Sequence, residues 1–142
     1  METQRNDLSW KLTSPTALLT LLLGAFMLFL SILSRVDPVG GARGFGLPLS
    51  GSEALPWLSI KSGRDLGIGL ALVAIVATRQ RLAAGLFVLA STVMPVVDAL
   101  TVLKSGASLA LALSVHGSAA VYCVVLASAL LRPSAIRKDR QS

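Results

Sequence analysis

The feature that most limits what this chain can fold into is the gathering of its apolar residues into long, almost uncharged blocks. Hydrophobic residues make up 54% of the 142 positions and charged residues only 14%, whereas about a quarter of a soluble domain is charged. A helix needs roughly 20 mostly apolar residues to cross a bilayer. The sequence therefore predicts a single integral membrane domain over residues 1–142, all-α in class.

We predict four transmembrane helices, at about residues 15–35, 57–78, 82–103 and 108–131. The second is the least regular, because its uncharged part (66–78) is too short to cross a bilayer and the helix must carry Arg64 and Asp65 into the membrane. Short links join the last three helices, so we expect antiparallel neighbours in a four-helix transmembrane bundle. Residues 35–54 hold five glycines and two prolines and are expected to form a Gly/Pro-rich loop between helices 1 and 2.

The lysines and arginines beside the spans predict the orientation. Eight of them lie in the N-terminal segment, the link between the second and third spans, and the tail, whereas four lie on the opposite side. Because cytoplasmic loops carry the excess of these residues, both termini are expected in the cytoplasm. The prediction is a multi-pass protein of the cytoplasmic (inner) membrane of a bacterium, with a basic, disordered tail at 132–142.

The net charge of +6 does not indicate nucleic acid, because the cations flank apolar blocks and no nucleic-acid-binding motif accompanies them. Membrane lipid is the expected partner of these charges. His116 and Cys123 are the only residues of their kinds, which excludes the usual His and Cys zinc clusters. We therefore expect no metal and no cofactor. No nucleophile elbow or phosphate-binding loop is present, and whether the chain is an enzyme stays open.

Arg35 and Lys61 stand near the outer ends of their spans and are counted with the flanking cations. Four ionisable residues lie deeper in the predicted spans: Arg64, Asp65, Asp98 and His116. A charge at the centre of a bilayer costs roughly 2.5–3.5 kcal/mol on insertion scales, so each needs an explanation. At about 1.5 Å per residue, Arg64, Asp98 and His116 lie roughly 8–12 Å from the outer ends of three different helices. Ionisable groups from three helices thus share one half of the membrane.

Two interpretations of this cluster stay open. In one, the residues pair among themselves and only set the register of the helices, as buried ion pairs often do. In the other, they line a cavity that holds a lipophilic small molecule. Arg64 would then bind an anionic or carbonyl group, while Asp65, Asp98 and His116 would handle protons or hydrogen bonds.

Two further functions are compatible with the same residues. The chain could be a membrane-embedded acid–base isomerase or cyclase, with Asp65, Asp98 and His116 as the candidate catalytic residues. It could instead be an accessory or assembly subunit with a purely structural ion network, in a homo-oligomer or with a protein partner. A small-residue stripe beginning Gly63-x-x-x-Gly67 on the second span predicts close helix packing there.

Three short stretches resemble one known family: the run from Lys61 to Gly69, the step Pro95-x-x-Asp98, and His116-Gly117. The family is that of small four-span integral membrane proteins of bacteria and fungi called domain of unknown function four-two-six-seven. The resemblance covers about 18–131 and implies the four-span fold and the same four polar residues. It implies no substrate. Small multidrug transporters are similar in size, but they carry a glutamate in the first span, which 16–33 lacks.

Overall fold

The computed structural model describes residues 10–51 and 55–132, and these residues form helices and short connections with no strand. The all-α class is therefore confirmed. In chain order the elements are α2 (Pro15–Val36), α3 (Pro38–Phe45), α4 (Leu55–Ala77), α5 (Arg81–Ser91), α6 (Val93–Lys104), α7 (Leu109–Leu111), the π-helix η2 (Ala112–Gly117) and α8 (Ser118–Leu131). The predicted tail lies outside the described residues, apart from Arg132.

Three helical stretches are long and apolar enough to cross a membrane: Pro15–Val36, Arg81–Lys104 and Leu109–Leu131. The second is α5 continued by α6, and the third joins α7, η2 and α8. The helix α4 is also 23 residues long, but it carries three charged residues in its first half and is not among the three. Membrane-like character is thus established for three of the four predicted spans.

The surfaces of these helices carry many large apolar side chains. On α2, for example, Leu22, Phe29 and Ile32 are each more than half exposed. Soluble monomers rarely expose large contiguous apolar patches. Such a surface is typical of helices that cross a membrane, which agrees with the long apolar blocks of the sequence.

The segment between the first two long helices is not only a loop, as predicted, because α3 occupies its first part. The Asp37 side chain accepts a hydrogen bond from the amide of Gly40, and Pro38 stands at the first helical position. These two start signals outweigh the unfavourable glycines that follow. The helix ends at Gly46, whose φ of 96° is a left-handed conformation that glycine adopts without strain.

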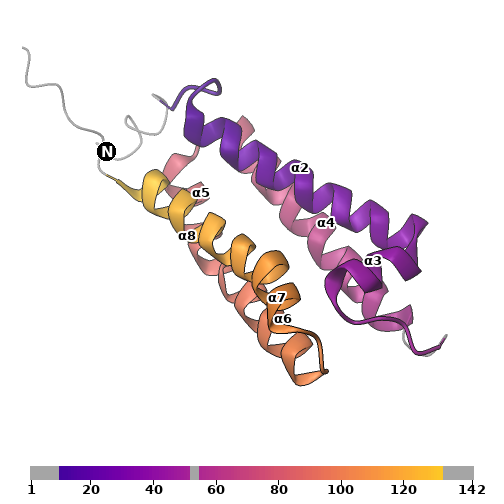
Figure 1. Cartoon of the computed structure of the whole chain (residues 1–142). Helices are drawn as coiled ribbons and strands as arrows, with labels where there is room; N and C mark the ends of the chain where they lie inside the picture. The colour runs from indigo at the N-terminus through magenta and orange to yellow at the C-terminus, as the bar shows by residue number, and fades with distance from the viewer. Residues whose placement is uncertain (1–9, 52–54, 133–142) are drawn as a thin grey trace, which may run out of the picture.

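The long helices associate as two antiparallel pairs, α2 with α4, and α5–α6 with η2–α8 (Figure 1). In the first pair the backbones approach closely at Gly24 and Gly69. A Cβ atom at Gly69 would lie 2.7 Å from the Leu28 side chain and 2.9 Å from the Gly24 carbonyl oxygen. The expectation that Gly63 and Gly67 mediate helix packing within the chain is wrong, because both are exposed and, apart from neighbouring residues of the same helix, no atom of the described residues lies within 4 Å of an added Cβ.

An apolar core holds the two pairs together near the start of α2 and the end of α8. Its buried members come from all four long helical stretches and include Ala17, Leu72, Val88 and Leu126. The charged residues of α4 lie towards the opposite end, beside α3. The fold therefore separates an apolar, closely packed end from an end where polar side chains meet.

Candidate functional site

The site begins with three charged residues in the first half of α4. Residues four apart on a helix face the same side, and the Lys61 Nζ atom lies 2.6 Å from Asp65 Oδ2. Both side chains are buried, with only 8% and 1% of their surface exposed. Burying either charge alone would be strongly unfavourable. Each residue can be buried only because the other compensates its charge.

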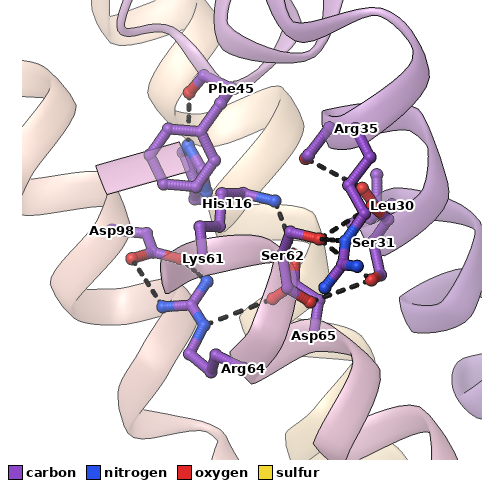
Figure 2. Close-up of polar contacts among 11 residues, drawn as sticks. Leu30, Ser31, Arg35, Phe45, Lys61, Ser62, Arg64, Asp65, Asp98 and His116 are labelled. Atoms are coloured by element: carbon purple, nitrogen blue, oxygen red, sulfur yellow. Dashed lines mark hydrogen bonds and ion pairs between the residues drawn. The ribbon is translucent and has the colours of Figure 1, made fainter. Parts of the chain in front are cut away.

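Arg64 extends this pair to a second helix. Its Nε atom lies 3.2 Å from Asp65 Oδ1, and its Nη2 and Nη1 atoms lie 3.3 and 3.5 Å from the two carboxylate oxygens of Asp98 on α6. One guanidinium therefore joins carboxylates from two helices (Figure 2). Arg64 and Asp98 are less buried than the first pair, at 34% and 17% exposed.

His116 approaches the same place from η2. Its Nε2 atom lies 2.9 Å from the carbonyl oxygen of Phe45, to which it donates a hydrogen bond, and its ring meets the Phe45 ring edge-on at 4.8 Å. The Phe45 ring in turn lies 5.2 Å from Lys61 Nζ, within cation–π distance. His116 thus connects η2 to the end of α3 and forms no ion pair with Asp65 or Asp98.

The turn that carries His116 is a π-helix over Ala112–Gly117. A π-helical turn shifts every later side chain around the helix axis relative to an α-helix, and such turns are frequent at functional sites. A second irregularity faces it, because the helix between α5 and α6 is interrupted at Thr92, one turn before Pro95. Proline removes a helical hydrogen bond, which accounts for this interruption.

All four predicted site residues line one cavity of about 630 Å³ between the two helix pairs. This volume is within the range of ordinary small-molecule sites. The polar end of its wall also includes Lys61. The rest is mainly apolar and includes Leu22, Phe26, Ile68, Phe87, Met94 and Val115. The cavity therefore has a charged end near α3 and an apolar body between the helices.

Sequence reasoning missed two residues of this site. Lys61 was expected to be a flanking cation outside the membrane that helps to set orientation, but it is buried against Asp65. The spacing of four residues from Asp65 was a signal that could have found it. Phe45 carried no such signal, because its contacts with His116 and Lys61 depend on where α3 lies over the other helices.

A separate group of polar residues binds α2 to α4 outside the cavity lining. The hydroxyl of Ser31 lies 2.9 Å from the Ser62 carbonyl oxygen, and the hydroxyl of Ser62 lies 2.9 Å from the Ser31 carbonyl oxygen. Arg35 Nε donates to Ser62 Oγ at 2.7 Å (Figure 2). These reciprocal bonds satisfy polar groups at a close helix contact, so we assign them a structural role.

The chemistry open to the site follows from these groups. Within the described part of the chain, no three His, Cys, Asp or Glu side chains lie close enough to hold a metal ion. The wall instead presents guanidinium and ammonium donors, carboxylate acceptors and an imidazole beside a large apolar volume. Such a wall suits the binding of a molecule with one polar end.

The fold and site define a small all-helical protein with membrane-type helices around a partly polar cavity. Residues 24–130 match the family described as domain of unknown function (DUF4267), and the chain belongs to that family. The resemblance seen in the sequence is therefore confirmed, and all four polar residues lie within the matched region. Neither the curated proteins nor the solved structures contain a match to the chain.

Proposed function

We propose that this protein holds a lipophilic small molecule with one polar end in the cavity between its two helix pairs. A single observation carries the proposal. Charged groups from α4 and α6, together with His116 from η2, line one end of a cavity of about 630 Å³ whose remaining wall is mainly apolar. An amphiphilic molecule would match both parts of this wall.

The proposal includes the placement of the chain in a membrane as one four-span domain. Because α4 packs along the apolar helix α2, and its Lys61 and Arg64 pair with Asp65 and Asp98 inside the protein, we assign α4 as the remaining span, the second in chain order. The ion pairs compensate the cost of carrying these charges into the bilayer. With Lys61 buried, three cations remain on the side opposite the termini, which strengthens the bias that places both termini in the cytoplasm.

Cysteine labelling tests this orientation. Cys123 is the only cysteine, so a Cys123→Ala background allows a single cysteine to be placed at Ser50 or at Gln80. In intact bacterial cells, a membrane-impermeant maleimide is expected to label the Ser50→Cys protein and to leave the Gln80→Cys protein unlabelled. Labelling of only the Gln80→Cys protein would reverse the proposed topology.

In the proposed complex the polar end of the ligand lies at Arg64 and Asp98, the more accessible charged pair of the wall. Arg64 can donate hydrogen bonds to a carbonyl or an anionic group, and Asp98 can accept one from a hydroxyl or an amide. His116 lies close enough to line the same end of the cavity. The apolar part of the ligand would contact the side chains of α2 and α5.

Mass spectrometry of small molecules that co-purify with the protein tests ligand binding directly. We expect a compound enriched with the wild type and lost from Ala119→Phe, because Ala119 lines the cavity and a phenyl ring would occupy its volume. Val121→Phe is the matched control, since Val121 is 64% exposed on the outside of the same helix. Enrichment that persists in folded Ala119→Phe would refute the proposal.

One observation favours a second candidate, an accessory subunit whose ion network is structural. Arg64 contacts both carboxylates, Lys61 contacts Asp65, and His116 bonds to Phe45, so each polar residue has a partner within the chain. Under this alternative no compound would be enriched in any sample. A protein partner would instead cover an apolar outer face, and crosslinking in membranes would identify it.

A further inference from the structure

We infer that the polar end of the ligand is uncharged and both donates and accepts hydrogen bonds, as an amide or a hydroxyl group does. The inference rests on the ligand-binding function proposed above and narrows it to a chemical class. It follows from the sum of charges around the cavity, from which of those charges remain accessible, and from the distances between them.

The charges of the cavity wall cancel. Its charged lining residues are Lys61, Arg64, Asp65 and Asp98, two cations and two carboxylates, and His116 is counted as uncharged, as in the formal net charge of the chain. Arg35 is not counted, because it does not line the cavity and its Nε atom instead donates to Ser62 Oγ at the contact of α2 with α4. A ligand with a charged end would leave one charge without a partner in a mainly apolar cavity, which is strongly unfavourable.

Access to these charges is uneven. Asp65 is enclosed by two cations and is 1% exposed, and Lys61 is 8% exposed. The pair of Arg64 and Asp98 is more open, and its contacts of 3.3 and 3.5 Å are long for a bidentate ion pair. A ligand reaching the polar end of the cavity therefore meets this pair first.

Arg64 and Asp98 together offer a donor beside an acceptor. A guanidinium has five N–H groups, whereas a carboxylate accepts only, so an approaching group must accept from one and donate to the other. A hydroxyl or a primary amide does both without adding charge. A sulfate or carboxylate would face Asp98 with like charge, and a quaternary ammonium group would face Arg64 in the same way.

The test compares three probes that share a sixteen-carbon chain and differ in their polar ends: hexadecanamide, hexadecyl sulfate and hexadecyltrimethylammonium. Purified protein in phosphatidylcholine nanodiscs is equilibrated with each probe. The amount retained above that in empty nanodiscs is measured by mass spectrometry. We expect the wild type to retain hexadecanamide over either charged probe by about tenfold or more, the scale of leaving a buried charge unpaired.

Two variants should reverse this preference in opposite directions. Asp98→Asn leaves an excess cation and should favour hexadecyl sulfate, while Arg64→Gln leaves an excess carboxylate and should favour hexadecyltrimethylammonium. The Arg64→Gln/Asp98→Asn double variant is neutral again and should return to hexadecanamide. A structural role alone would not produce this exchange of charge preference.

The outcomes separate the two proposals. If the wild type retains none of the probes above empty nanodiscs, ligand binding itself fails, and the inference fails with it. If the wild type binds but prefers a charged probe, the inference is overturned and the binding function stands. The preference of the wild type decides the matter even if a single variant does not fold, and an unchanged preference in folded Asp98→Asn also overturns the inference.

Discussion

Replacement of Asp65 by asparagine is predicted to be the most destabilising single change in the charged cluster. The carboxylate accepts from Lys61 Nζ at 2.6 Å and from Arg64 Nε at 3.2 Å, and its side chain is 1% exposed. Asparagine keeps the size of the side chain but removes its charge. Lys61 would then stay buried as a cation without a carboxylate partner.

The magnitude follows from this burial. Breaking a buried ion pair by removing one partner typically costs about 3–5 kcal/mol, and we expect Asp65→Asn to lower the free energy of unfolding by that amount. Asp98→Asn removes a longer contact between partly exposed groups, 34% and 17% exposed. Because Arg64 keeps its contact with Asp65 in this variant, we expect a loss nearer that of one charged hydrogen bond, about 1.5–3 kcal/mol, and therefore smaller than that of Asp65→Asn.

Reversible unfolding in mixed micelles of dodecyl maltoside and sodium dodecyl sulfate, followed by circular dichroism, measures this difference. The double variant Lys61→Met/Asp65→Asn removes both buried charges and should recover part of the loss, which a double-mutant cycle isolates. If Asp65→Asn lowers the free energy of unfolding no more than Asp98→Asn does, Asp65 is not the residue on which the charged cluster depends. If the double variant is no more stable than Asp65→Asn, the pairing of Lys61 with Asp65 is not the source of the effect.

Three further predictions concern packing and caps. Gly69→Ala should destabilise the protein by about 1–3 kcal/mol, because its Cβ atom would overlap Leu28, whereas Gly67→Ala should be neutral or slightly stabilising in the same unfolding assay. His116→Ala removes a hydrogen bond worth about 1 kcal/mol, so the amides of α3 should exchange with deuterium roughly fivefold faster. Arg81→Ala removes hydrogen bonds to two carbonyl oxygens at the end of α8 and should cost about 1–2 kcal/mol.

Each of these predictions has a result that would contradict it. Equal stability of the two glycine variants would mean that α2 and α4 do not meet at Gly69. Unchanged deuterium exchange in α3 of His116→Ala would show that His116 does not hold that helix. The control is Ser114→Ala, which changes an exposed residue of the same turn. If Arg79→Ala lowers the free energy of unfolding as much as Arg81→Ala does, the effect comes from positive charge near the link between α4 and α5 and not from the hydrogen bonds of Arg81.

The sequence by itself determined the local features of this protein. The apolar blocks predicted the long helices, and α2 begins at Pro15, where the first predicted span begins, with Ser14 as its cap. The four ionisable residues could be singled out because charge inside an apolar block has a cost that does not depend on the fold. The Asp37-Pro38 start signal was also in the sequence, but its glycines favoured a loop, and α3 was missed for that reason.

Only the tertiary structure decided which of these residues meet. Arg64 contacts Asp98 34 positions away, and His116 bonds to Phe45 71 positions away, and both contacts depend on how the helices are rotated about their axes. The choice of Gly69 rather than Gly67 for the close helix contact has the same cause, since two residues along a helix turn the side chain by about 200°. Hydropathy and capping are properties of a single segment of the chain, so the sequence shows them directly. The rotation and register of the helices are set by the packing of whole helices against one another, and they decided where the cavity lies.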